Sequence, residues 1–537
     1  MKAFQILSIA ILFATHSACS PTNKNVKATI TADNVPILSL KPTNKVASVA
    51  LVNQAPMEQH ISGLSLSLKA THNLSDLTSL DIMQGGQTLV STHLDLQGKE
   101  ATIDCSLHVG LTDTLRLDVC LQLADTIELL NKISFSGLQV STSEGTVRTD
   151  CARLPQLRVG IALRQHGQDG VHTTRIPGLT VTPRGTLIAM YDARRNQSDD
   201  LQGDIDICYN RSTDGGRSWS RMMTAIDMGQ WGGLPQKYNG VSDGSVTCDT
   251  TTGKLFICGV WMHGIMDPTT GKWVEGLTDE STAWNHQWRE HGSQPGYDVR
   301  QSSQFLMVES TDDGLTWSAP RNLTRDVKPE QWWLMAPAPG AGITLADGTL
   351  VIPAEGRDET GLQVTTIVYS RDHGASWKAG NVATTNSNEN MVIQLADGSL
   401  MLNARERSNR GKTEGNGRAI AVSADLGTTW TKHATSRSAL IEPACQASLI
   451  KHEGIVYFFN PNNTHKRVNH TLKVSRDDGN TWPQAYWIEF DANQGAGYSC
   501  MAVWGDDLCI LYEGSGADLV FQKIKLSEIA ECFNDKI

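Results

Sequence analysis

The stretch STDGGRSW, Ser212 to Trp219, returns with small changes four more times along the chain. The later copies are STDDGLTW from Ser310, SRDHGASW from Ser370, SADLGTTW from Ser423 and SRDDGNTW from Ser475. In such a turn the Asp side chain accepts hydrogen bonds from backbone amides, Gly takes a positive φ and Trp packs on a neighbouring unit. The phrase therefore predicts five copies of one turn, and by itself it indicates no ligand.

A second repeated element, a short apolar strand after a glycine turn, alternates with the Asp phrase. It occurs after Gly185, Gly253, Gly348, Gly398, Gly454 and Gly505. Units of about four strands at intervals of about fifty to seventy residues, without helical periodicity, are typical of a β-propeller. The sequence thus predicts an all-β protein in which residues 153–537 form a six-bladed β-propeller, with both kinds of turn on one face.

The distribution of aromatic residues marks a boundary before the propeller. All 14 Trp and all 9 Tyr lie after residue 190, whereas residues 24–151 hold a single aromatic residue, Phe135. Apolar and polar residues alternate in this early part, for example over Leu115–Leu123, which predicts a small antiparallel β-sandwich. Small sandwich modules of carbohydrate-active enzymes often bind sugars by stacking them on exposed aromatic rings. Because residues 24–151 hold one Phe and no Trp or Tyr, a role as a spacer or packing partner is a simpler interpretation than sugar binding.

The first nineteen residues indicate export. An apolar run from Ile6 to Ala14 follows Lys2 and leads to Ser17 and Ala18, as in a secretory signal, and it is too short to span a bilayer. At Cys19 two alternatives stay open: lipidation, as in bacterial lipoproteins, or simple removal of the signal. We expect a periplasmic, surface-bound or secreted protein.

Charge and cysteine content narrow the ligand class. The chain has 46 Lys and Arg against 57 Asp and Glu, a formal charge of −11, which argues against nucleic acid or an anionic membrane as partner. None of the cysteines has the CxxC spacing that is typical of a zinc site, and we expect neither a metal nor a cofactor. Four cysteines that flank apparent hairpin turns are interpreted as buried thiols, with cross-strand disulfides as the alternative: Cys248, Cys258, Cys500 and Cys509. Three histidines are interpreted as surface or core residues and not as metal ligands: His286, His291 and His452.

Polar residues should gather at the propeller axis, on the face opposite the repeated turns. Counting back seven to ten residues from the glycine turns gives Arg175, Asp243, residues 338–340, Glu389, residues 444–446 and Tyr498. Counting forward seven to nine residues gives Arg194 and Arg405, and Arg467 lies in a loop on the same face. Arginines aimed at one point persist where an anion is bound, and their planar forks suit a carboxylate. The substrate should therefore carry a carboxylate.

With these residues the sequence resembles the bacterial exo-α-sialidases, in particular the secreted type with a β-sandwich before the propeller. The resemblance rests on Arg175-Ile176-Pro177, the five Asp boxes and the ordered series of polar residues. It covers essentially the whole chain after the signal. It implies that Arg175, Arg405 and Arg467 form a substrate-binding triad and that Asp200, in preference to Asp199, is the acid/base residue. It further implies that Tyr498 is the nucleophile and Glu389 its partner, and that Arg194 and Asp243 line the sugar pocket.

The resemblance also implies a reaction, the hydrolysis of terminal sialic acid from sialylated glycans with retention and without a cofactor. Sialic acid carries its carboxylate on the anomeric carbon, so a phenol approaches that carbon with less repulsion than a carboxylate does. Sialidases with a tyrosine nucleophile are a known exception to the two-carboxylate pattern of glycosidases. The alternatives are a non-catalytic sialic-acid lectin, and a trans-sialidase acting between molecules or within one.

One insertion, Trp261 to Tyr297, interrupts the regular spacing of the repeats. Its tryptophans could overhang the pocket and receive an aglycone, or could anchor the insertion to the disc: Trp273, Trp284 and Trp288. The sequence leaves these two interpretations open.

Overall fold

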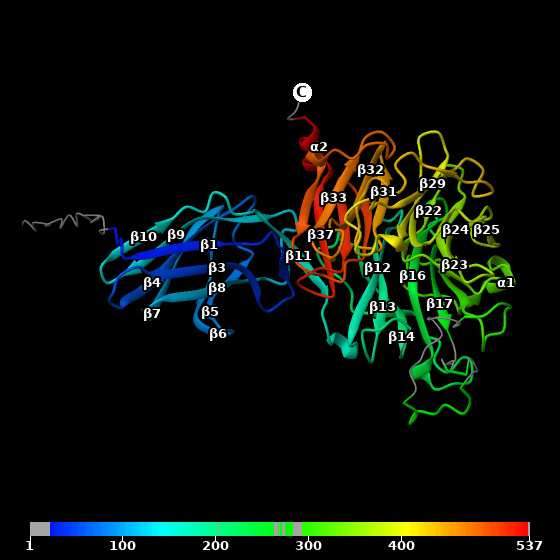
Figure 1. Ribbon diagram of the computed structural model, residues 1–537, viewed down its shortest axis with the longest axis horizontal. Coiled ribbons are helices and arrows are strands. Elements are labelled where there is room, and N and C mark those ends of the chain that lie inside the picture. Colours follow the sequence, from blue (N-terminus) through cyan, green and yellow to red (C-terminus); the bar gives the residue numbers. More distant parts are fainter. Residues whose placement is uncertain are drawn as a thin grey trace, which may run out of the picture.

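A computed structural model describes residues 22–201, 203–262, 267, 269–270, 274–282 and 293–534. Several features discussed above lie outside these ranges: residues 1–19 with Cys19, Trp273, Trp284, Trp288, His286 and His291. The described chain forms an elongated N-terminal part and a larger disc, both built of strands (Figure 1). No helix in these ranges is long and apolar enough to cross a membrane.

The N-terminal part consists of two antiparallel sheets whose facing sides are apolar. In β1 (Val26–Thr31) every second residue is buried, as the alternation in the sequence requires when one face of a sheet packs on a core. One sheet has the order β1-β3-β8-β5-β6 and the other contains β7, β4, β9 and β10. The bounds are β3 Asn44–Asn53, β4 Gln59–Ala70, β5 Leu77–Gln84, β6 Gln87–His93, β7 Glu100–Leu111, β8 Thr114–Leu123, β9 Lys132–Thr142 and β10 Gly145–Thr149.

A single strand, β11 (Leu157–Arg164), joins the two parts. It pairs with β9 through Leu157 and Ile133, and with β37 (Leu519–Lys525) through Ile161 and Phe521. The short strand β2 (Ile37–Ser39) pairs with β11 in parallel. Because β11 belongs to a sheet that continues from one part into the other, the exact domain boundary near residues 151–153 stays a prediction.

The disc is a β-propeller of antiparallel meanders. The strands are β12 Thr173–Val181, β13 Leu187–Arg194, β14 Ile205–Ser212, β15 Met223–Ile226; β16 Gly240–Cys248, β17 Leu255–Met262, β18 Gln304–Ser310, β19 Arg321–Asn322; β20 Leu334–Pro337, β21 Gly340–Ala341, β22 Ile343–Thr344, β23 Leu350–Arg357, β24 Gln363–Ser370, β25 Lys378–Ala379, β26 Thr384–Thr385; β27 Ser387–Gln394, β28 Leu400–Glu406, β29 Ala419–Ser423, β30 Thr431–Lys432; β31 Ser448–His452, β32 Ile455–Pro461, β33 His470–Ser475, β34 Ile488–Asp491; β35 Ser499–Trp504, β36 Asp507–Tyr512 and β37. Two helices, α1 (Thr324–Val327) and α2 (Leu526–Asn534), complete the disc.

The first strands of the meanders surround the axis of the disc. Strand β12 contacts both β16 and β35, so the last meander closes on the first. The predicted propeller is therefore confirmed. The number of six blades stays a prediction, because parallel bridges such as that between Ile205 and Gly240 merge neighbouring meanders into larger sheets.

The repeated Asp phrase forms the turn that the sequence predicts. The carboxylate of Asp214 accepts hydrogen bonds from the Ser218 amide at 3.0 Å and from the Ser212 hydroxyl at 2.8 Å. Gly216 has a φ of 86°, and a Cβ atom there would lie 2.2 Å from Phe521 of the adjoining meander. The Trp219 ring packs on the same Phe521, with ring centres 5.0 Å apart. Each phrase thus ties its own turn to a neighbouring meander.

These turns make a prediction about acid stability. Hydrogen bonds from Thr316 and Ser310 lower the pKa of Asp312 to about 2, whereas an unfolded Asp has a pKa of about 3.9. Because the folded-state pKa is depressed, this stabilisation is present above about pH 4 and is lost as the pH falls toward about 2. We expect Asp312→Asn to lower the Tm by about 1–2 °C at pH 7, with a difference from wild type that shrinks as the pH falls.

Thermal unfolding followed by circular dichroism from pH 7 to pH 2 measures this effect. The matched control is Asp326→Asn, because the exposed Asp326 carboxylate lies 3.8 Å from Arg321 and caps no such turn. Equal Tm values for Asp312→Asn and wild type at pH 7 would show that the carboxylate does not stabilise the turn.

The cysteines are free thiols in the described part of the chain. Nine of them are buried and Cys532 is half-buried. Cys248 pairs in register with Leu255, and Cys258 pairs with Ser245, so the two thiols are not opposite one another. The interpretation as buried thiols is confirmed for Cys248, Cys258, Cys500 and Cys509.

Candidate active site

Three of the inner strands contain a β-bulge near the disc face that lies opposite the repeated turns. The register shifts between Arg175 and Gly178 in β12, and likewise in β16 around Asp243 and in β27 around Glu389. At two of these shifts a residue other than Gly takes a positive φ, 62° at Ile176 and 55° at Asp243. A bulge adds a residue to one strand and re-aims its side chains. These bulges lie where the sequence predicts the pocket.

At the centre of this face a tyrosine, a glutamate and an arginine are in direct contact. The Tyr498 hydroxyl donates a hydrogen bond to Glu389 Oε1. One guanidinium nitrogen of Arg405, Nη1, donates to Glu389 Oε2 at 2.6 Å and to the Tyr498 hydroxyl at 3.0 Å. Tyr498 and Glu389 are each 6% exposed. Arg405 and Glu389 lie 93 and 109 positions before Tyr498 in the sequence, and both contact its hydroxyl oxygen.

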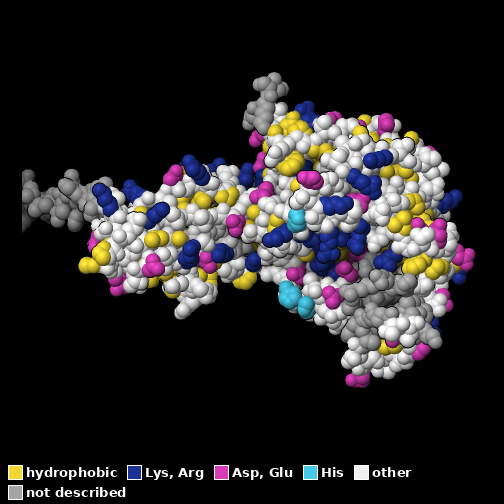
Figure 2. All heavy atoms as spheres, in the orientation of Figure 1, with side chains coloured by type: hydrophobic (Ala, Val, Ile, Leu, Met, Phe, Trp, Pro, Cys, Tyr) yellow, Lys and Arg dark blue, Asp and Glu magenta, His cyan; other side chains and the backbone are white. Residues whose placement is uncertain are grey.

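Two further arginines lie over the Tyr498 ring. The guanidinium carbons of Arg175 and Arg467 are each 5.3 Å from the ring centre. Arg467 Nη1 also donates to the Ala496 carbonyl oxygen at 2.6 Å. Figure 2 shows Lys and Arg side chains gathered in the middle of the visible face of the disc. The structure thus brings the three predicted arginines together around Tyr498.

A buried carboxylate that the sequence analysis missed holds part of this arrangement. Glu513 is fully buried, and its Oε1 accepts from Arg175 Nε at 2.6 Å and from the Ile176 amide at 2.8 Å. Its Oε2 accepts from the Tyr498 amide at 3.0 Å. Burial would raise the pKa of Glu513, but Arg175 and these hydrogen bonds bring it below its ordinary value. Glu513 therefore stays charged and fixes Arg175 beside Tyr498.

The second predicted group of residues lies on the first meander. Arg194 is 1% exposed, and its Nη2 lies 2.6 Å from Asp200 Oδ1 and 3.2 Å from Asp192 Oδ2. Asp200 is 52% exposed. Burial of its remaining surface tends to raise the pKa of Asp200, but the charges of Arg194 and then Arg175 lower it. Asp200, the residue favoured over Asp199, therefore extends from the arginine cluster toward solvent.

Two buried acids complete the pocket. Burial, and then the charges of Asp192 and Asp200, raise the pKa of Asp243 well above its ordinary value. Glu355, in β23, was not predicted, and burial followed by the charge of Glu389 raises its pKa to about 8. The raised pKa values favour the neutral form of both acids, which limits the negative charge near the arginines.

The described residues offer no group of three or more His, Cys, Asp or Glu side chains placed to hold a metal ion. His452 Nε2 lies 3.9 Å from the exposed Glu453 carboxylate, near the glycine turn after β31.

Fold and site together define a class, an Asp-box β-propeller with an arginine-rich axial pocket around a tyrosine–glutamate pair. The family model described as the BNR repeat-like domain matches residues 185–510, more than half of the chain. The chain belongs to the sialidase family that carries this domain.

Several known proteins are similar to this chain. It is 41% identical to a sialidase of Bacteroides fragilis over 69% of this chain and 65% of the relative, and 32% identical to a sialidase of Micromonospora viridifaciens over 60% and 47%. The chain thus spans less than two thirds of the length of these two relatives. The solved structure of the Hadza microbial sialidase Hz136 superposes with a TM-score of 0.77 at 30% identity, over 93% of this chain and 99% of that one. The intramolecular trans-sialidase of Ruminococcus gnavus, at 20% identity and a TM-score of 0.53, shares the fold.

Proposed function

We propose that the protein is an exo-α-sialidase that hydrolyses terminal sialic acid from glycans with retention of configuration. The observation that carries the proposal is the contact of Tyr498 with both Glu389 and Arg405, beneath Arg175 and Arg467. The sialidases of Bacteroides fragilis and Micromonospora viridifaciens named above support the same activity.

The arginines define the binding mode. Three guanidinium groups around one point repel each other unless an anion neutralises them, and a carboxylate matches their planar donors. In sialic acid the carboxylate and the glycosidic oxygen share the anomeric carbon. Binding of the carboxylate by Arg175, Arg405 and Arg467 therefore delivers that carbon to the Tyr498 hydroxyl.

Tyr498 then acts as the nucleophile. Burial, and next the charge of Glu389, raise the pKa of Tyr498 well above its ordinary value, so the free phenol holds its proton. Glu389 accepts that proton as the phenol oxygen bonds to the anomeric carbon and the glycosidic bond breaks. Asp200 gives its proton to the departing glycosidic oxygen. It later takes a proton from the water that attacks the anomeric carbon of the tyrosyl intermediate, while Glu389 returns its proton to the departing Tyr498 oxygen. Two inversions at the same carbon give net retention.

The charge of Asp200 fits this cycle once substrate is included. In the free protein Arg194, Arg175 and also Arg405 lower the pKa of Asp200, which disfavours an acid. The substrate carboxylate would add one negative charge beside two of these arginines, Arg175 and Arg405, and would offset part of their effect on Asp200. Binding therefore raises the pKa of Asp200 toward the range in which it can donate a proton.

The rival functions predict different products. A lectin needs the arginines but has no use for the hydrogen bond between Tyr498 and Glu389, so this contact favours an enzyme. Trans-sialidases would use the same residues and differ in whether water or another hydroxyl completes the reaction.

A time course of 3′-sialyllactose cleavage, followed by proton NMR, tests the proposal. We expect lactose and the α anomer of free sialic acid to appear together, before mutarotation forms the β anomer. The β anomer as first product would refute retention, an anhydro product or a transferred sialic acid would support a trans-sialidase, and binding without any product would support a lectin.

A further inference from the structure

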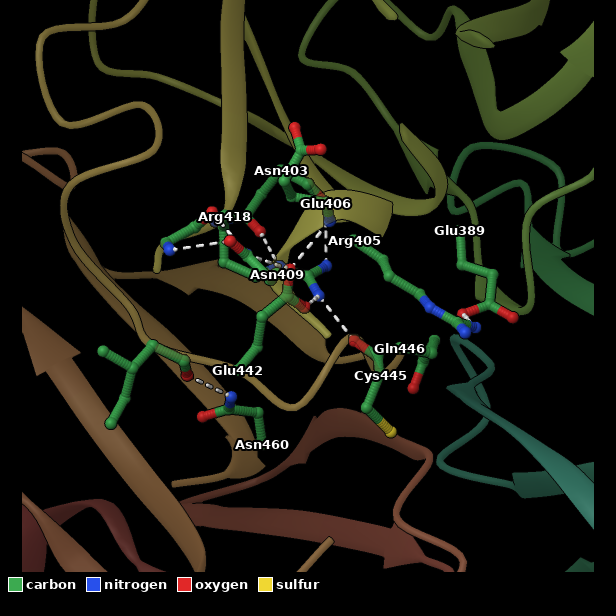
Figure 3. A network of polar contacts seen from close by, with 12 residues as sticks. Glu389, Asn403, Arg405, Glu406, Asn409, Arg418, Glu442, Cys445, Gln446 and Asn460 are labelled. Carbon is green, nitrogen blue, oxygen red and sulfur yellow. Dashed lines mark hydrogen bonds and ion pairs between the residues drawn. The ribbon is translucent and has the colours of Figure 1, made fainter. Parts of the chain in front are cut away.

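A buried polar network lies behind Arg405, on the side away from Glu389 (Figure 3). Its centre is an ion pair between Arg418 Nη1 and Glu442 Oε2 at 2.5 Å, and both side chains are fully buried. Neither residue contacts Tyr498 or Glu389 in the hydrogen bonds of the described chain. The site described above does not account for this pair.

The ion pair holds the strand that carries Arg405 from both sides. Arg418 Nε donates to the Asn403 side-chain oxygen at 2.7 Å, two residues before Arg405. Glu442 Oε1 accepts from the Glu406 amide at 2.7 Å, directly after Arg405, and from Asn409 Nδ2 at 2.9 Å. Arg418 Nη2 also donates to the Asn403 carbonyl oxygen at 3.3 Å, so the backbone is held on both sides of Arg405. The Arg405 side chain itself bonds to Glu389 and Tyr498.

The segment that contains Glu442 also reaches the strand that begins beside Tyr498. Gln446 donates from Nε2 to the Ser499 carbonyl oxygen and accepts from the Ser499 amide, each at 2.9 Å. Cys445 packs with Tyr498 and Ile176 in one apolar cluster, and its carbonyl oxygen accepts from Arg418 Nη1 at 2.6 Å. Residues 442–446 thus connect the backbone next to Arg405, through Glu442, with the backbone next to Tyr498, through Gln446.

A buried ion pair is a poor source of stability. Removing two charges from water costs several kcal/mol per ion, and apolar replacements of similar volume are often as stable or more stable. The pair fixes the position of Arg405 relative to Tyr498. Its hydrogen-bond partners Asn403 and Glu406 flank Arg405, and the segment that contains Glu442 bonds to Ser499, the residue after Tyr498. A displacement of about 1 Å in a reacting group can reduce a rate about 100-fold.

We infer that the Arg418–Glu442 pair positions Arg405 against Tyr498 and Glu389, so that it sets the efficiency of the reaction without touching substrate. This inference rests on the proposed function, since its measure is sialoside cleavage. Arg418 and Glu442 act through Arg405, which makes them positioning residues.

The variant that tests the inference is Glu442→Gln, which keeps the size of the side chain and its Oε1 acceptor but removes the charge opposite Arg418. We expect kcat/KM for an aryl sialoside to fall about 10- to 100-fold. In Arg405→Lys the guanidinium to be positioned is absent, so adding Glu442→Gln should then cost less than about threefold. A purely structural role would instead give independent, multiplicative losses.

The matched control is Asp507→Asn. The Asp507 side chain is 4% exposed and forms ion pairs with Lys523 and Lys525, each at 2.7 Å, but it follows the Gly505 turn on the face opposite the pocket. Asp507→Asn should lower the Tm as much as Glu442→Gln does, with kcat/KM within about twofold of wild type. Kinetics are measured on folded protein, judged by circular dichroism and gel filtration.

The outcomes separate the inference from the function. An inactive wild type would overturn the proposed function, whereas an active wild type with an equally active, folded Glu442→Gln variant would overturn the positioning role alone. Full additivity with Arg405→Lys would also overturn it. If Glu442→Gln does not fold, Arg418→Lys, which keeps the charge but loses the planar fork, is measured in the same cycle, and failure of both to fold would assign the pair to stability instead.

Discussion

Replacing Tyr498 with Phe is expected to abolish turnover of an aryl sialoside, with a loss of at least about 1,000-fold in kcat. The change deletes the oxygen that contacts Glu389 and Arg405 and keeps the ring beneath Arg175 and Arg467. The arginines still bind the carboxylate, so the affinity for free sialic acid should stay within about tenfold of wild type. Fluorescence assays with a good leaving group measure the first effect, and isothermal titration calorimetry measures the second.

The control for this variant is Tyr209→Phe. Tyr209 is also buried, but its hydroxyl donates to the Gly314 carbonyl oxygen at 3.0 Å in an Asp turn far from the pocket. This variant should lose stability and keep its activity. Turnover by Tyr498→Phe at the wild-type rate would remove Tyr498 from the reaction.

Replacing Asp200 with Asn is expected to separate substrates by leaving group. A natural glycoside needs a proton on the departing oxygen, so its kcat/KM should fall about 100- to 10,000-fold. The aryl group of an activated sialoside leaves without that proton, so kcat/KM for this substrate should fall much less, about tenfold or below. Parallel assays with 3′-sialyllactose and a nitrophenyl sialoside give the two values.

Asp199→Asn serves as the matched control, because the two residues are neighbours and, among the residues that the structure describes, Asp200 and not Asp199 forms an ion pair with Arg194. It should leave both substrates near the wild-type rate. Equal losses for both substrates in Asp200→Asn, or a larger effect in Asp199→Asn, would assign the acid to another residue.

Much of the site could be predicted because a propeller repeats its strand lengths. Counting from the glycine turns places Arg175, Glu389, Arg405 and Tyr498 near the axis from the sequence alone, since strand register converts a residue count into a position along the strand. The same forward count of eight residues from Gly505 also reaches Glu513. It was overlooked because a carboxylate is unexpected where an anion binds, and its hydrogen bonds to Arg175 explain its presence.

Other features could not be predicted, for physical reasons. The bulges at Ile176 and Asp243 place non-glycine residues at positive φ, and nothing in local sequence chemistry signals that conformation. The Arg418–Glu442 pair joins residues 24 positions apart through tertiary packing, so no short motif identifies it. The sharing of β11 between the two parts depends likewise on pairing with β37, more than 300 residues later.

The central claim is that Tyr498 becomes covalently bonded to the anomeric carbon within the arginine pocket. Incubation with 2,3-difluorosialic acid tests it most directly, because the C2 fluoride departs readily while the C3 fluorine slows breakdown of the intermediate. After proteolysis, mass spectrometry should find the sugar on the peptide that contains Tyr498, and Tyr498→Phe should stay unlabelled. A label on any other residue, or an active enzyme that the reagent neither labels nor inhibits, would contradict the account.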